Sequence, residues 1–150
     1  MAHPARMTTN TAMTATPTND ADASTPAATT PVPQVTWFEV HTPNPTDATE
    51  FYGGLFGWTF TDEAGGTYYD IRQVDGQAIG GGVANTGGEW PAQVIPCVQV
   101  SDVAGTCGRA GDLGGKVLAG PNQTPNGITF AYLADRDGSA FGVWCPPAQA

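Results

Sequence analysis

A six-residue pattern that occurs twice decides the fold: it reads Asp75-Gly76-Gln77-Ala78-Ile79-Gly80 and then Asp137-Gly138-Ser139-Ala140-Phe141-Gly142. The two copies begin 137 − 75 = 62 residues apart. In each copy an Asp-Gly turn leads into a short strand of small and apolar residues. An internal repeat of this kind predicts that one structural module is used twice. A cleft between two such modules is a natural place for a ligand.

Each copy closes a segment with the same order of predicted elements. In the first segment, alternating and helical patterns predict a strand over 35–41, a helix over 48–56, and strands starting at 58, over 67–74 and over 77–84. In the second, they predict a strand over 93–100, a helix from 102 to about 113, and strands starting at 116, over 127–134 and over 140–145. The order β-α-β-β-β, used twice, predicts the α+β class with the helices on one face of the sheet.

The rest of the chain sets the expected boundaries. Residues 1–33 are almost entirely Ala, Thr, Pro, Ser, Asn and Asp, a composition that predicts a disordered tail. We therefore expect one domain over 34–147, with module one at 35–84, a linker at 85–91 and module two at 92–147, followed by a short tail at 148–150. The sequence shows no secretory signal and no run of apolar residues long enough to span a membrane.

Charge and cysteine content narrow the choice of partners. Five basic residues against fourteen acidic ones give a net charge of −9, which argues against nucleic acid and is compatible with a cationic small molecule. Three cysteines, an odd number without a CxxC pair, argue for reduced thiols in the cytoplasm rather than a disulfide framework.

Three further motifs accompany the paired modules. They are Phe51-Tyr52 with Leu55-Phe56-Gly57-Trp58 at the first helix end, Leu113-Gly114-Gly115-Lys116-Val117, and the closing run from Asp135 to Trp144. With these motifs the chain resembles the vicinal oxygen chelate superfamily, the glyoxalase, bleomycin resistance protein and dioxygenase type, over about 35–147. The resemblance implies a cup-shaped mixed sheet with helices on its outer face, a small-molecule ligand and a homodimer. It does not fix the chemistry, since one fold serves several unrelated activities.

The resemblance also implies where a metal would be held. Carried over by position, the ligand sites of metal-dependent members fall on Trp37, Gly80, Ile95 and Gly142, and none of these side chains can bind a metal. The predicted domain has one histidine, His41. We therefore expect no metal and no other cofactor. The remaining alternative is a displaced site in which Glu39 and His41 are joined by Cys97 and Gln99.

Strand alternation predicts which side chains face the cleft. Phe38 and Val40 should face the helix, which puts Trp37, Glu39 and His41 on the opposite face. The same reasoning selects Ile95, Cys97 and Gln99 on the fifth strand and Trp144 on the last. The third strand is ambiguous between Tyr68 and Tyr69, of which Tyr69 is chosen as a ligand-binding residue. Gly80, Gly82 and Gly142 are expected to leave room in the cleft.

These features support more than one function. The first hypothesis is a metal-independent small-molecule-binding protein that sequesters an antibiotic or another aromatic or cationic metabolite. The second is a cofactor-free enzyme that uses Glu39 and His41 as an acid–base pair. Two others are a metal-dependent lyase or oxidoreductase of the glyoxalase or dioxygenase type, and a reactive thiol at Cys97.

Overall fold

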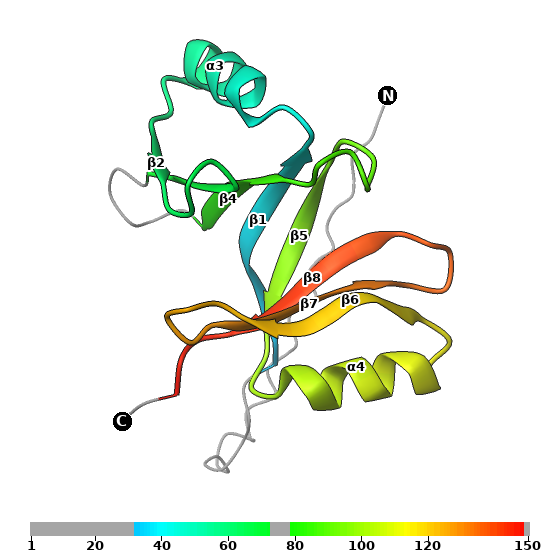
Figure 1. Ribbon diagram of the computed structural model, residues 1–150. Helices are drawn as coiled ribbons and strands as arrows, with labels where there is room; N and C mark the ends of the chain where they lie inside the picture. The colour runs from blue at the N-terminus through cyan, green and yellow to red at the C-terminus, as the bar shows by residue number, and fades with distance from the viewer. Residues whose placement is uncertain (1–31, 73–78, 149–150) are drawn as a thin grey trace, which may run out of the picture. The chain divides into compact units, whose positions relative to one another are not determined.

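The computed structural model describes residues 32–72 and 79–148 (Figure 1). Most of the predicted N-terminal tail and the first Asp-Gly turn, Asp75-Gly76, lie outside the described residues, as do the last two residues. None of the described helices is long and apolar enough to cross a membrane.

The described residues form one eight-stranded mixed sheet in the order β2-β3-β4-β1-β5-β8-β7-β6 (Figure 1). Its two halves have the same internal strand order, which confirms the predicted α+β class and the double use of one module. The strands are β1 (Gln34–Thr42), β2 (Phe60–Asp62), β3 (Tyr68–Ile71), β4 (Gly80–Asn85), β5 (Gln93–Gln99), β6 (Lys116–Gln123), β7 (Thr129–Ala134) and β8 (Ala140–Cys145), and the helices are α3 (Pro45–Phe56) and α4 (Val103–Asp112).

The two halves meet where β1 pairs with β5. These strands run antiparallel, with Phe38 opposite Pro96. On either side, β4 runs parallel to β1 and β8 runs parallel to β5. The antiparallel junction therefore relates the halves by an approximate twofold axis, and it brings the first strands of both modules to the middle of the sheet.

Both helices end within one residue of the predicted positions, whereas α3 begins at Pro45, three residues before the predicted start at residue 48. Asn44 caps α3 by accepting a hydrogen bond from the Asp47 amide, and Gly57, at a φ of 76°, ends it in the left-handed conformation. In the second half Asp102 caps α4 by accepting a hydrogen bond from the Gly105 amide at 3.0 Å. Two strands begin two residues later than predicted: β2 begins at Phe60 rather than at residue 58, and β7 begins at Thr129 rather than at residue 127.

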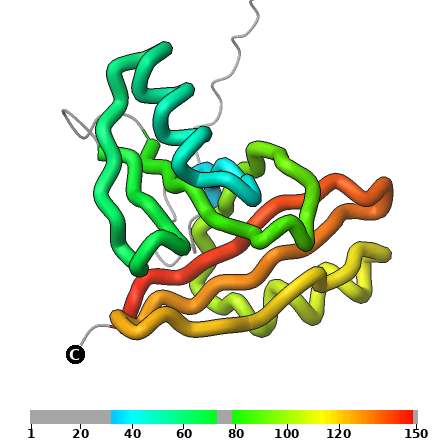
Figure 2. Tube along the Cα trace, turned by 45° about the horizontal axis from the view of Figure 1, so that its top comes forward, coloured from blue at the N-terminus to red at the C-terminus, as the bar shows by residue number. Residues whose placement is uncertain are grey.

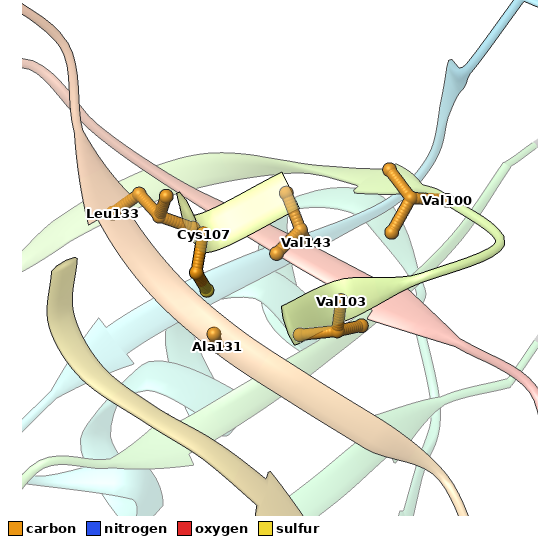
Figure 3. Close-up of a cluster of buried hydrophobic side chains, with 6 residues drawn as sticks. All are labelled: Val100, Val103, Cys107, Ala131, Leu133 and Val143. Atoms are coloured by element: carbon orange, nitrogen blue, oxygen red, sulfur yellow. The ribbon is translucent and has the colours of Figure 1, made fainter. Parts of the chain in front are cut away.

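The sheet face that carries the helices holds two hydrophobic clusters. In the second half, the buried side chains of the cluster come from the residue after β5, from α4, and from β7 and β8, as Figure 3 shows: Val100, Val103, Cys107, Ala131, Leu133 and Val143. In the first half, Val40, Ala48 and Val83 form the cluster, with Phe38 packed against it. The predicted helix-facing residues of β1 are thus confirmed. Figure 2 shows α4 running alongside the strands of the second half.

Removing Leu133 should be costly because it is fully buried beneath α4. We expect Leu133→Ala to lower the free energy of unfolding by about 2–5 kcal/mol, from lost burial plus the cavity left behind. Urea denaturation followed by circular dichroism measures this. Leu118→Ala is the matched control, because Leu118 is 42% exposed on β6 and should lose far less. Equal losses in the two variants would contradict the described core.

Candidate ligand site around a buried carboxylate

The sheet face opposite the helices has a buried carboxylate at its centre. Glu39 of β1 is 8% exposed. Its Oε1 accepts a hydrogen bond from the Tyr132 hydroxyl at 2.6 Å, and its Oε2 accepts one from the Tyr68 hydroxyl at 2.9 Å. The Nε2 atom of His41 lies 3.0 Å from Oε1. Three donors from β1, β3 and β7 therefore take the place of the water that an exposed carboxylate would have.

A second layer of donors orients this network. The indole Nε1 of Trp37 donates a hydrogen bond to the Tyr68 hydroxyl at 2.8 Å, so the tyrosine accepts from Trp37 while donating to Glu39. Hydrogen bonds to an ionised acceptor are about twice as strong as neutral ones. Within the described part of the chain, His41 is the one basic side chain within salt-bridge distance of Glu39. Tyrosine hydroxyl groups therefore supply most of the hydrogen bonds that hold the Glu39 carboxylate.

The negative charge of Glu39 also affects the hydroxyl and thiol groups near it. Burial, and then the charge of Glu39, raises the pKa of Tyr68 and of Tyr132 well above the ordinary value of a phenol. The same two causes raise the pKa of the Cys97 thiol. Cys97 is therefore held as a neutral thiol at physiological pH, which is unfavourable for the nucleophilic or redox role considered from the sequence.

His41 is enclosed by aromatic rings. It is 1% exposed, and its ring centroid lies 5.4 Å from that of Trp90 and 5.3 Å from that of Tyr132. The Trp90 and Tyr132 rings meet edge to face at 5.0 Å. Trp90 comes from the segment between β4 and β5, so a residue of the intermodule connection covers the histidine.

The space above three glycines is filled by side chains of the chain itself. A Cβ placed at Gly80 would collide with the Trp37 indole, and one at Gly82 would collide with the Tyr68 hydroxyl. A Cβ at Gly142 would lie 3.0 Å from the Cys97 sulfur. The expectation that these glycines leave room for a ligand is therefore wrong: they leave room for the aromatic and thiol side chains that surround Glu39.

The structure brings most of the predicted site residues together. Trp37, Glu39 and His41 share one face of β1, and Ile95 and Cys97 are buried opposite Glu39 and Trp37 in the paired strand β5. Of the remaining two predicted residues, Gln99 lies farther along β5 and Trp144 lies on β8. Gln99 pairs with Trp144, whose Nε1 donates a hydrogen bond to the Thr36 hydroxyl at 3.1 Å.

One predicted residue lies on the other face. Tyr69 packs against the cluster of Val40, Ala48 and Val83, on the side of the helix. Its neighbour Tyr68 is the tyrosine that reaches Glu39. The choice of Tyr69 is corrected to Tyr68, because strand alternation allows only one of two neighbours to share the face of Glu39.

Two members of the site did not emerge from the sequence. Strand alternation could have predicted Tyr132, since its neighbours Ala131 and Leu133 are the core-facing residues of β7. Trp90 had no such signal, because it lies in an irregular connection where no periodicity indicates a direction.

The residues present do not fit a metal of the kind that the fold family can hold. The four positions implied by the resemblance carry Trp, Gly, Ile and Gly, and the Trp37 ring covers Gly80. The displaced alternative also fails the test, because Gln99 lies four residues along β5 from Ile95, the residue opposite Glu39, so the four side chains do not converge. Within residues 32–72 and 79–148, no three His, Cys, Asp or Glu side chains come together as a metal-binding group. We derive no chemistry through a metal.

Two modules with a mixed sheet, helices on one face and a polar centre on the other define a class of paired β-α-β-β-β proteins. Residues 34–143 match the family model of the Glyoxalase/Bleomycin resistance protein/Dioxygenase superfamily. The chain belongs to this superfamily, as the sequence motifs had suggested.

Comparison with individual proteins gives relatives of greater length. The chain is 27% identical over 124 residues to "Anthracycline biosynthesis protein DauV" of Streptomyces sp. (strain C5), an alignment that covers 72% of this chain and 45% of the relative. It is 30% identical over 120 residues to "Putative glyoxylase CFP32" of Mycobacterium bovis (strain ATCC BAA-935 / AF2122/97), covering 75% of this chain and 44% of that protein. The chain thus spans a little under half the length of the curated relatives that it matches.

Solved structures support the fold. A methylmalonyl-CoA epimerase from Streptomyces coelicolor superposes with a TM-score of 0.54 at 14% identity, covering 79% of this chain and 100% of the epimerase chain. A hypothetical protein, BH1468 from Bacillus halodurans C-125, gives a TM-score of 0.56 at 12% identity, covering 80% of this chain and 99% of that one. At these identities the likeness shows the shared fold alone.

A methyl group added at Gly82 should disturb the carboxylate network. We expect Gly82→Ala to displace the Tyr68 hydroxyl from Glu39 and to lower the free energy of unfolding by about 1–3 kcal/mol, the cost of overpacking and of a lost hydrogen bond. Gly108→Ala is the control, since Gly108 in α4 has nothing within 4 Å and alanine should stabilise the helix. Thermal denaturation of both variants tests this, and an unaffected Gly82→Ala would contradict the described packing.

The raised phenol pKa values predict a loss of stability at alkaline pH. Tyr68 and Tyr132 keep their protons longer in the folded state than in the unfolded one, so folding is favoured fully below the unfolded pKa of 10.0 and less as the pH rises above it. We expect the free energy of unfolding to fall above about pH 10, and to fall less steeply in Tyr132→Phe. Urea titrations at several pH values measure the slope. A slope unchanged by the substitution would count against this account.

Proposed function

We propose that this chain is a metal-independent small-molecule-binding protein whose ligand is a planar aromatic compound, neutral or cationic. The observation that carries the proposal is the buried Glu39 carboxylate held by Tyr68, Tyr132 and His41. A carboxylate offers about four acceptor positions, and three are taken here. Oε2 therefore retains the capacity to accept one more hydrogen bond, or to face a positive charge.

The surroundings of Glu39 favour an aromatic ligand. Trp37, Tyr68, Tyr132 and Trp90 supply flat apolar surface around a single charged group, which is the composition of a small-molecule site. The net charge of −9 favours cations over anions. One relative is named for anthracycline biosynthesis, and we extend the aromatic character of that product class to the ligand of this chain.

Tryptophan fluorescence tests the proposal. We expect proflavine, a planar cation, and anthraquinone, a planar neutral compound, both to quench the fluorescence of the full chain. Glu39→Gln should weaken proflavine binding by about tenfold through the lost charge, while anthraquinone changes little. Glu50→Gln, on the exposed side of α3, is the control with the same change in net charge. The absence of any response across a broad panel of planar compounds would overturn the proposal.

A second candidate function is cofactor-free proton transfer, and one observation favours it. Glu39 engages Nε2 of His41, which leaves Nδ1 of the same ring as the nitrogen able to take a proton. In such an enzyme His41→Gln would abolish turnover of a carbonyl probe, such as incorporation of solvent deuterium into hydroxyacetone, with ligand affinity within a few-fold of the original. Loss of affinity without measurable turnover in the original chain would leave binding as the function.

Two further parts of the proposal concern assembly and location. We infer a cytoplasmic homodimer, in line with the reduced cysteines Cys97, Cys107 and Cys145. The outer surface of α3 supports self-association, because Phe51, Leu55 and Phe56 are more than half exposed there.

A further inference from the structure

Two buried side-chain atoms have no hydrogen-bond partner among the described residues: Nδ1 of His41 and Oγ1 of Thr86. His41 is 1% exposed, and its other nitrogen is already engaged by Glu39. Nearly all buried polar groups in folded proteins are hydrogen bonded, because leaving one without a partner forfeits its hydration. Two such atoms therefore indicate that something other than the described residues satisfies them, such as a ligand or an ordered water molecule.

Strand alternation puts the two residues on the same face of the sheet. In β4, the space above Gly82 is taken by Tyr68, so the even-numbered residues of this strand share the face of Glu39. Ala84 is paired with His41. The Thr86 amide donates to the Thr42 carbonyl at 2.9 Å, which extends the β1–β4 ladder by one step. Strand alternation continued past Asn85 thus puts Thr86 on the face of His41, two residues beyond Ala84.

The Trp90 ring covers His41, and the segment that carries Trp90 is held by hydrogen bonds within its own turn. Its ring stands 5.4 Å from that of His41. Gly87 and Gly88, just before it, have φ angles of 64° and 84°, which glycine adopts without strain. In the described structure the hydrogen bonds of residues 87–89 stay within the turn, with Asn85 and Thr86 as acceptors. Trp90 can therefore move off His41 without breaking a hydrogen bond of the sheet.

We propose that His41 Nδ1 and Thr86 Oγ1 form a polar subsite beneath Trp90 that binds a hydroxyl group of the ligand, an inference that rests on the proposed function. In the tautomer whose Nε2–H donates to Glu39, the His41 ring presents an acceptor at Nδ1, while the Thr86 hydroxyl can donate. A hydroxyl group donates to the first and accepts from the second. An ammonium group could reach both atoms only by giving up its hydration beneath Trp90, which is far more costly. The ligand class is thus a hydroxylated planar aromatic.

A matched pair of probes isolates the hydroxyl group. 2-Naphthol and naphthalene share one ring system, and their affinities can be measured by nuclear magnetic resonance titration of the full chain. We expect 2-naphthol to bind about tenfold more tightly, the gain from one or two hydrogen bonds. Thr86→Val keeps the shape of the side chain and should reduce this preference by about fivefold, with naphthalene unchanged. Thr86→Ser keeps the hydroxyl and should retain the preference.

A second measurement uses the unmodified chain and so does not require that any variant folds. We expect the ¹⁵N resonance of His41 Nδ1 to shift on addition of 2-naphthol and to stay in place with naphthalene, because only the first probe can donate a hydrogen bond to it. Trp90→Ala should bind 2-naphthol with a faster association rate, since the covering ring is removed.

The outcomes separate this inference from the function on which it rests. A preference for 2-naphthol that survives Thr86→Val, or a His41 resonance that ignores both probes, overturns the subsite and leaves aromatic binding standing. A Thr86→Val variant that is less stable but keeps the preference shows that a structural water bridges the two atoms, which also overturns the subsite. Failure of both naphthalenes together with every compound of the fluorescence panel overturns the proposed function.

Discussion

The buried carboxylate of Glu39 is the constraint on which the interior of this protein depends. A charge removed from water is costly unless it is hydrogen bonded or paired. Here the donors come from both modules: Tyr68 from the first and Tyr132 from the second, 93 residues away from Glu39 along the chain. The network therefore does more than satisfy one side chain. It ties together two halves that otherwise meet through the antiparallel pairing of β1 with β5.

The same network explains the glycines that the sequence repeats. Trp37 and Tyr68 approach the sheet so closely that no side chain fits at Gly80 or Gly82. The positions where metal-dependent members of the superfamily place ligands are thus used here for packing and for orienting donors toward Glu39. One fold can host unrelated chemistries because such positions can change without altering the sheet. The site of this chain is accordingly a hydrogen-bonded carboxylate within an aromatic wall.

The two faces of the sheet serve different purposes. The helix side carries the close-packed clusters around Leu133 and Val40, whose burial stabilises the fold. The opposite side carries polar groups that are costly to bury, and two of them, on His41 and Thr86, have no partner in the described chain. Such groups need a partner from outside the described residues, which a ligand or an ordered water molecule can supply. This contrast supports a function located beneath Trp90 and around Glu39.

The sequence by itself determined the repeated module, the α+β class, and the shared face of Trp37, Glu39 and His41. These features depend on contacts close in sequence and on the two-residue period of a strand, which any short stretch displays. Only the tertiary structure decided between Tyr68 and Tyr69, because β3 has aromatic or apolar residues on both faces and so shows no alternation. Tertiary structure also brought in Tyr132 and Trp90 and filled the space above the glycines. Strand order and register set these contacts, and neither is encoded within a local window of residues.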